Sequence, residues 1–274
     1  MKNFAIGLAI LVAAIFGICG CGKNSGTKTA RINFPLPEPP LVADCRTGIP
    51  GGRLVLSTFG DPKTFNPITA NESSSQEIYR LLFTSLLGDD PNTEEVTPGL
   101  ADSWTNSPDG KTWTFHLRKN LHWSDGAPLT ADDVVFTFND VIYNPKIDNV
   151  TRDVLQVDGK NFKVTKIDDL TVQVVTPEIF APFLEAFGAG VAILPKHILE
   201  KSVADGTFAS AYGINWQPEK IVGSGPFVIK EYKPAQYVLL ARNPYFFEVD
   251  SNGQRLPYLD DIIYSILPDW NAMS

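Results

Sequence analysis

The sequence mixes short alternating β-type stretches with amphipathic helical stretches, and this mixture excludes most fold classes. Residues 53–59 alternate as a strand does, and residues 75–87 place apolar side chains on one helical face behind a Ser74-x-x-Glu77 capping box. A Pro108-Asp109-Gly110 turn precedes a second alternating strand at 112–118. Because strands and helices do not alternate regularly, we expect mixed α/β or α+β layers and not a barrel.

The rest of the chain carries further elements of both kinds. A Thr130-x-x-Asp133 capping box predicts a helix from Ala131 that ends at Asn144-Pro145. A short helix is expected near residues 182–187. Further strands are predicted at 170–175, 227–232, 237–241 and 262–267. No internal repeat or heptad pattern accompanies them.

Charge and cysteine content narrow the function classes. The chain has 23 basic and 31 acidic residues, a formal net charge of −8, and no long run of Lys or Arg. A nucleic-acid partner is therefore not expected, because neutralising phosphates needs a dense basic face. Three cysteines, at 19, 21 and 45, and three histidines are too few for a disulfide framework or an evident metal site. No metal ion and no cofactor is expected.

The N-terminus predicts the compartment. Lys2 precedes an uncharged stretch from Phe4 to Ile18, which has the length of a signal-peptide core and is too short to cross a bilayer comfortably. The stretch ends in Ile18-Cys19-Gly20-Cys21, which resembles a bacterial lipobox. We therefore expect residues 1–20 to be a lipoprotein signal peptide. Cys21 would be the lipidated residue of an exported protein, lipid-anchored to the membrane and periplasmic or at the cell surface.

Residues 21–50 are predicted to form a Pro-rich tether between this anchor and the folded body. They show no apolar period, and five prolines favour extended geometry over a packed element. The alternative is an ordered arm that wraps the body, which the Leu41-Val42 pair permits.

No catalytic constellation is found. Gly223-Ser224-Gly225-Pro226 lacks the Gly-x-Ser-x-Gly spacing of a nucleophile turn, and Pro226 leads into a strand where a helix would be required. His116 and His122, six residues apart on an extended chain, would lie about 20 Å from each other, too far to share an ion. His197 is expected to be a solvated or capping residue at a helix start.

Two blocks of residues resemble the dipeptide/oligopeptide-binding family of bacterial extracellular solute-binding proteins, family 5. The resemblance extends over residues 51–272 and rests on long motifs in the right order. The first block is Leu100-Ala101-Asp102-Ser103-Trp104, then Asp109-Gly110-Lys111-Thr112-Trp113-Thr114-Phe115-His116-Leu117-Arg118-Lys119, then His122-Trp123-Ser124-Asp125-Gly126 and Pro128-Leu129-Thr130-Ala131-Asp132-Asp133-Val134-Val135-Phe136. The second is Gly223-Ser224-Gly225-Pro226-Phe227, Lys230-Glu231-Tyr232-Lys233-Pro234 and Arg242-Asn243-Pro244-Tyr245.

The resemblance implies a type II periplasmic-binding-protein clamp that closes on a solute by hinge motion and delivers it to ABC permease subunits. Residues 51–70 and 190–268 would form the first lobe, and residues 71–189 an inserted β-rich subdomain. Residues 269–274 resemble the run that leads into the second lobe, which is missing from the sequence. We therefore expect an N-terminal portion of a longer solute-binding protein.

The ligand site is the least defined part of this expectation. In the family the cleft-lining segment follows an Asn-Pro pair, here Asn66-Pro67, so Asn71 and Ser73 are candidate ligand contacts. The alternative for Ser73 is a loop residue that caps the next helix. The solute, whether a peptide, an oligosaccharide, an opine or a nickel chelate, stays open. Two other functions also stay open: an exported hydrolase of peptides or glycans, and a structural envelope lipoprotein.

Overall fold

The computed structural model describes residues 34–90 and 93–268. The predictions for the leader, for Cys21 and for residues 269–274 lie outside the described residues. All described residues belong to a single compact unit. No helix within this part of the chain has the length and apolar character needed to cross a membrane.

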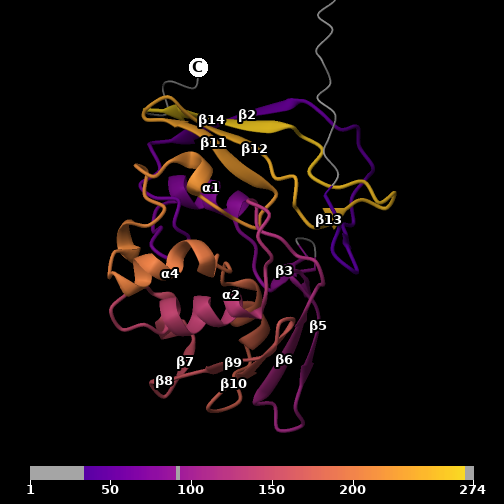
Figure 1. The fold of residues 1–274 in the computed structure, drawn as a ribbon, viewed down its shortest axis with the longest axis vertical. Helices are drawn as coiled ribbons and strands as arrows, with labels where there is room; N and C mark the ends of the chain where they lie inside the picture. The colour runs from indigo at the N-terminus through magenta and orange to yellow at the C-terminus, as the bar shows by residue number, and fades with distance from the viewer. Residues whose placement is uncertain (1–33, 91–92, 269–274) are drawn as a thin grey trace, which may run out of the picture. The chain divides into compact units, whose positions relative to one another are not determined.

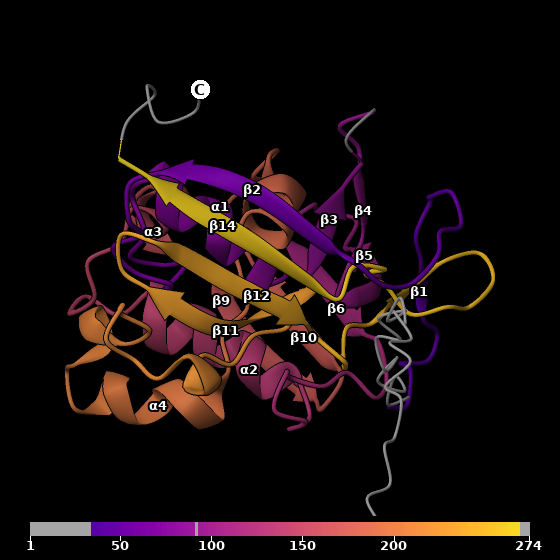
Figure 2. The same cartoon turned by 90° about the horizontal axis from the view of Figure 1, so that it is seen from above.

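One four-stranded sheet joins the two ends of the described chain. Its order is β11 (Phe227–Lys233), β12 (Tyr237–Arg242), β14 (Asp261–Leu267) and β2 (Arg53–Phe59), as Figure 2 shows from above. β2 pairs with β14 in parallel, from Arg53 opposite Asp261 to Phe59 opposite Leu267. The strands predicted at 53–59, 227–232, 237–241 and 262–267 are confirmed to within a residue.

A second four-stranded sheet is antiparallel throughout and comes from the middle of the chain. Its order is β5 (Ala101–Asn106), β6 (Thr112–Leu117), β10 (Thr171–Val175) and β9 (Lys163–Asp168). The first sheet draws on residues 51–70 and 190–268 and the second on 71–189, the segments assigned above to the first lobe and the inserted subdomain. The domain boundaries themselves stay a prediction.

Helices fill the space between the two sheets, as Figure 1 shows. The main ones are α1 (Ser73–Leu82), α2 (Ala131–Val135) and α4 (Lys196–Ala204). Two wide π-helical segments, η1 (Phe136–Ile142) and η2 (Leu184–Ala189), stack Phe138 on Phe187 with ring centroids 3.9 Å apart. The smaller elements are α3 (Thr151–Val154), η3 (Phe208–Ser210), η4 (Pro218–Lys220) and the hairpins β3–β4 (Leu87–Asp89, Val96–Pro98) and β7–β8 (Gln156–Val157, Lys160–Asn161).

Buried side chains from both sheets and from the helices between them belong to one hydrophobic cluster. Ile262 and Leu240 come from the first sheet, and Phe115 and Val174 from the second. The predicted mixed α/β fold class is confirmed.

The prediction for α1 is wrong at both ends. The helix begins at Ser73 with Glu72 as N-cap, and no side chain caps it, so Ser74-x-x-Glu77 is not a capping box. It ends at Leu82 and not at residue 87, because the next backbone groups bond to other segments. Gly225 N donates to Leu82 O over 2.8 Å, and Ala101 N donates to Leu86 O over 2.8 Å.

The second capping box is confirmed. Thr130 is the N-cap of α2, and Asp133 accepts the Thr130 amide in return over 2.9 Å. Asp133 also accepts the Lys196 amide over 2.9 Å, which links the start of α2 to the start of α4. The helix continues to Ile142 as predicted, but its second half widens into η1.

Residues 34–50 form an ordered arm. For this stretch the structure agrees with the alternative prediction of an arm that wraps the body, and not with a free tether. Residues Leu41–Val42 are β1, which pairs in parallel with β13 (Glu248–Val249). The Glu38 amide donates to Lys119 O over 3.0 Å, and the Lys119 amide returns a bond of 3.2 Å. Phe34 stacks on Tyr245 at 4.0 Å. The arm therefore touches loops that belong to both sheets.

Candidate functional site

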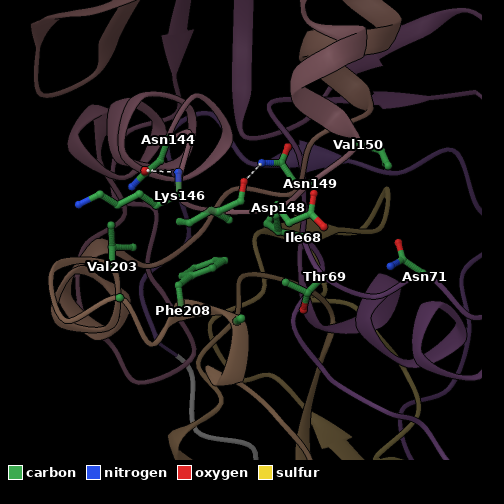
Figure 3. A pocket seen from close by; sticks show the side chains of 13 residues that line it. Ile68, Thr69, Asn71, Asn144, Lys146, Asp148, Asn149, Val150, Val203 and Phe208 are labelled. Atoms are coloured by element: carbon green, nitrogen blue, oxygen red, sulfur yellow. Dashed lines mark hydrogen bonds between the residues drawn. The ribbon is translucent and has the colours of Figure 1, made fainter.

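A cavity of about 370 Å³ with both polar and apolar lining opens where three loops meet, and Figure 3 shows it from close by. We call it the Asn71 cavity. One loop, residues 68–71, leads into α1; the second, residues 144–150, follows η1; the third, residues 203–209, runs from α4 into η3. Its volume lies within the range of small-molecule sites.

Asn66, at the start of the first loop, is fully buried and holds this wall in place. Its Oδ1 accepts the Ile68 amide over 3.0 Å, and its Nδ2 donates to the carbonyl oxygens of Ala211 and Phe208 over 3.2 and 3.4 Å. One side chain therefore shapes the first loop and ties it to the third.

Glu72 fixes the other end of the first loop, next to Asn71. Its carboxylate accepts the Ser75 hydroxyl and the backbone amides of Lys63 and Asn71. Partial burial acts to raise the pKa of Glu72, but these hydrogen bonds outweigh it, so the pKa lies below its ordinary value. The Asn71 backbone is thus set by an ionised neighbour.

The second loop is held by its own amide and guanidinium groups. Asn149 is 6% exposed, and its Nδ2 donates to Ile142 O and Ile147 O over 3.1 and 3.2 Å. Arg152 Nη1 donates to Asn144 O over 3.0 Å. These contacts order residues 144–150 without a regular element, and part of this network is drawn in Figure 3.

The chemistry of the cavity wall is amide-rich and nearly neutral. Only Lys146 and Asp148 carry charge, and both are exposed. Thr69 Oγ1 is buried and has no hydrogen-bond partner among residues 34–90 and 93–268. Phe208, 2% exposed, forms part of the apolar floor. Such a wall can bind an uncharged or zwitterionic solute through hydrogen bonds and apolar contact.

The structure separates the two candidate ligand contacts. Asn71 lines the cavity, whereas Ser73 is the first, exposed residue of α1 and is not among the lining residues. Ser73 does not cap the helix either, because Glu72 is the N-cap. Asn149 and Thr69 were missed. The Asn144-Pro145 helix stop located the loop that carries Asn149, but a helix stop says nothing about where that loop folds.

Ser224 has a structural environment. Its side chain is 3% exposed, accepts the Thr84 amide over 3.0 Å and lies 2.7 Å from the Thr84 hydroxyl. Ser224 therefore links the segment that follows α1 to the residues just before β11.

The three histidines lie apart in different surroundings. His197 Nε2 lies 2.8 Å from Asp125 Oδ2, His122 Nδ1 lies 2.9 Å from Asn120 O, and His116 Nδ1 lies 3.5 Å from the Thr171 hydroxyl. Among the residues that the structure describes, no group of three His, Cys, Asp or Glu is arranged to hold a metal ion.

Fold and cavity together define an α/β scaffold with a nearly neutral, amide-lined cavity between loops. Comparison with known proteins identifies its kind. The model of the family "Bacterial extracellular solute-binding proteins, family 5 Middle" matches residues 95–274. The chain therefore belongs to the family 5 bacterial extracellular solute-binding proteins.

Individual relatives agree with this assignment. A probable ABC transporter-binding protein of Deinococcus radiodurans is 34% identical over 81% of this chain and 38% of its own length. The structure of the Bacillus subtilis oligopeptide-binding protein AppA with a nonapeptide is 31% identical, covers 83% of this chain and 42% of that one, and has a TM-score of 0.69. The structure of the Agrobacterium fabrum periplasmic binding protein MelB with stachyose is 28% identical and has a TM-score of 0.71. The match covers 80% of this chain and 35% of that one.

The chain spans about two fifths of the length of the curated relatives it matches. Those relatives are named for binding peptides or for ABC transport. The predicted family and type II fold are confirmed.

Proposed function

We propose that this chain is part of the solute-binding component of an ABC importer and that the Asn71 cavity forms one wall of its solute site. The main support for this proposal is the cavity itself. Three loops from distant parts of the chain converge on it, and the buried amides of Asn66 and Asn149 fix two of them. Recognition loops that are held rigid lose little entropy on binding.

The chemistry of this wall favours a peptide or a related small polar solute. Amide side chains can donate to and accept from a peptide backbone or sugar hydroxyls, and Lys146 and Asp148 offer one charge of each sign. Relatives crystallised with a nonapeptide and with stachyose span the same two chemical classes.

The opposing wall would come from polypeptide outside these 274 residues, since the chain spans about two fifths of its relatives. A solute that touches both walls favours the closed state by its differential affinity, and permease subunits would recognise that state.

We further propose that the protein is exported and is anchored to a membrane through a lipidated Cys21, following a signal peptide at residues 1–20. Residues 21–33 would link the anchor to the arm that begins at residue 34. Fully extended, these reach roughly 45 Å at most. The body would then work close to the membrane that holds the permease.

The solute proposal is tested by incubating the purified chain with pools of peptides, oligosaccharides and nickel chelates and identifying retained molecules by mass spectrometry. We expect weak retention from one pool, reduced at least threefold by Asn71→Ala. Asn106→Ala, an exposed asparagine of β5 outside the cavity, is the matched control and should leave retention unchanged. Equal retention by wild type and Asn71→Ala would contradict the site assignment.

The anchor proposal is tested by Cys21→Ser. We expect the wild-type chain, expressed in a bacterium, to incorporate labelled fatty acid and to sediment with membranes, and Cys21→Ser to do neither. Cys45→Ser, which alters an exposed free cysteine of the arm, is the control. Unchanged labelling of Cys21→Ser would contradict lipidation at this residue.

A further inference from the structure

A second cavity, of about 650 Å³, lies at the other end of α1. We call it the Glu248 cavity. Its walls come from the last turn of α1, the β3–β4 hairpin, the segment after η2, the arm and β13, and it shares no lining residue with the Asn71 cavity. α1 is 10 residues long, so its ends are about 15 Å apart.

Glu248 is half-buried and contributes a carboxylate to the lining of this cavity. It lies in β13 between Phe247 and Val249, which are 4% and 1% exposed. Burial raises the pKa of Glu248, and the positive charge of Arg118 acts against that rise. The Glu248 side chain makes no hydrogen bond or salt bridge with any residue of the described ranges.

Arg118 does not neutralise Glu248 by direct pairing. Arg118 is 3% exposed, and its guanidinium donates to two carbonyl oxygens, to Gly99 O through Nε over 2.8 Å and to Pro39 O through Nη1 over 2.9 Å. Arg118 is not a lining residue of the cavity. The cavity therefore contains a carboxylate whose charge has no bonded partner on the protein side.

The remaining wall is suited to the body of an organic molecule. Tyr79, Phe83 and Phe247 bring aromatic rings, and Leu41 and Leu87 bring aliphatic surface. The other charged lining residues, Arg80 and Asp89, are exposed and offset each other. A half-buried carboxylate in a cavity that is also lined by aromatic residues favours a cation, through charge-assisted hydrogen bonds and cation–π contact.

We propose that the Glu248 cavity is a second ligand site, which binds a small organic cation: a primary amine on a short aliphatic or aromatic body. The ammonium group donates hydrogen bonds to the Glu248 carboxylate, and the body lies against the aromatic wall. This site is independent of the Asn71 cavity and of the solute proposed for it.

The test is calorimetric titration of the 274-residue chain at pH 7 with phenethylamine and with its uncharged counterpart, 2-phenylethanol. We expect one saturable site for the amine and at least tenfold weaker binding of the alcohol. Glu248→Gln keeps the shape of the side chain and removes its charge, so it should weaken amine binding at least tenfold. Amine affinity should also fall as the pH is lowered through the pKa of Glu248.

Two further variants keep the outcome interpretable. Glu178→Gln removes an exposed carboxylate that pairs with Lys111 elsewhere, and should leave amine binding unchanged. Ala192→Leu fills part of the cavity without altering a charge, and should abolish binding even if Glu248→Gln folds poorly. Equal binding of amine and alcohol, unchanged binding to folded Glu248→Gln, or no saturable amine binding by the wild type would each overturn the proposal. None of these results bears on the Asn71 cavity.

Discussion

Single buried amide side chains set the positions of the loops that form the Asn71 cavity. Asn66 and Asn149 each satisfy backbone groups that no helix or strand could reach. Because buried polar groups are costly when unpaired, such residues act as fixed points for irregular chain.

Replacing Asn66 should therefore destabilise the whole molecule. Asn66→Ala leaves the Ile68 amide and the carbonyls of Phe208 and Ala211 without their side-chain partner, and we expect a loss of about 2–4 kcal/mol in the free energy of unfolding. Urea denaturation followed by circular dichroism measures it. The exposed Asn106→Ala should stay within about 0.5 kcal/mol of wild type. A similar small loss for Asn66→Ala would show that the loop is held in another way.

Asp133 predicts a pH dependence of stability. Burial raises its pKa above 3.8, against the amide hydrogen bonds from Thr130 and Lys196. The Asp133 carboxyl group therefore keeps its proton to a higher pH in the folded chain than in the unfolded chain. The contribution of this protonated carboxyl group to stability is complete below pH 3.8 and is lost as the pH rises through the pKa of the folded state. The difference in unfolding free energy between wild type and Asp133→Asn should therefore fall as the pH rises from 4, and then level off.

Asp109 provides a control of opposite sign. The Ser107 hydroxyl and the Lys111 amide lower its pKa, so its contribution is present above pH 3.8 and is lost as the pH falls below that value. The difference in unfolding free energy between wild type and Asp109→Asn should therefore rise with pH in the acid range. Matching slopes for the two variants would contradict these assignments.

At the level of elements, tertiary hydrogen bonds decide where α1 stops. The apolar spacing from Ile78 to Leu86 is helical, and the sequence alone therefore predicted a helix to residue 87. Gly223 and Gly225 pack directly on the last turn, where a Cβ at either position would meet backbone atoms of Leu81 or Leu82 at 2.0–2.5 Å. A local pattern cannot report a contact with a segment 140 residues away.

Gly225→Ala tests this close approach. The added Cβ would lie 2.5 Å from Leu81 O and 2.6 Å from Leu82 C, and helix backbone cannot move aside cheaply. We expect a loss of more than about 3 kcal/mol in urea denaturation. At Gly159, with φ +70° and nothing within 4 Å of an added Cβ, alanine should cost only the conformational strain, about 1–2 kcal/mol. Equal losses at both positions would contradict the packing role of Gly225.

The arm is an element whose ordering the sequence left open. The prolines favour an extended chain both in a free tether and in an ordered arm. Only the residues that contact the arm show that it packs against the body. Arg255 supplies two of them, donating to Phe34 O over 2.7 Å and to Pro35 O over 2.9 Å. An arginine 220 residues further along the chain gives no local signal of such a contact.

Arg255→Ala should loosen this arm without unfolding the body. We expect hydrogen exchange of the Glu38 and Ala43 amides, which bond to Lys119 O and Val249 O, to become at least tenfold faster. Arg46→Ala, at an exposed position of the same arm, should leave both rates unchanged. Unaltered exchange in Arg255→Ala would mean that the remaining contacts of the arm, β1 and the Glu38–Lys119 bonds among them, hold it without Arg255.

For the whole molecule, the sequence predicted the fold class and the family better than it predicted the residues of the Asn71 cavity. Alternation, turns and the Thr130–Asp133 capping box indicated a mixed α/β body, and two motif blocks indicated the family. These signals are local or lie in contiguous runs. The Asn71 cavity joins residues from three separate loops, so only Asn71, which follows the Asn66-Pro67 pair, was among the predicted contacts.

The account rests on the claim that the Asn71 cavity contacts the transported solute. Nuclear magnetic resonance of the ¹⁵N-labelled chain, titrated to millimolar concentrations with a nonapeptide and separately with stachyose, tests it most directly. The account predicts saturable shifts for one of the two solutes, concentrated in the amides of residues 68–71, 144–150 and 206–209. Shifts that cluster elsewhere on the chain, or none with either solute, would contradict it.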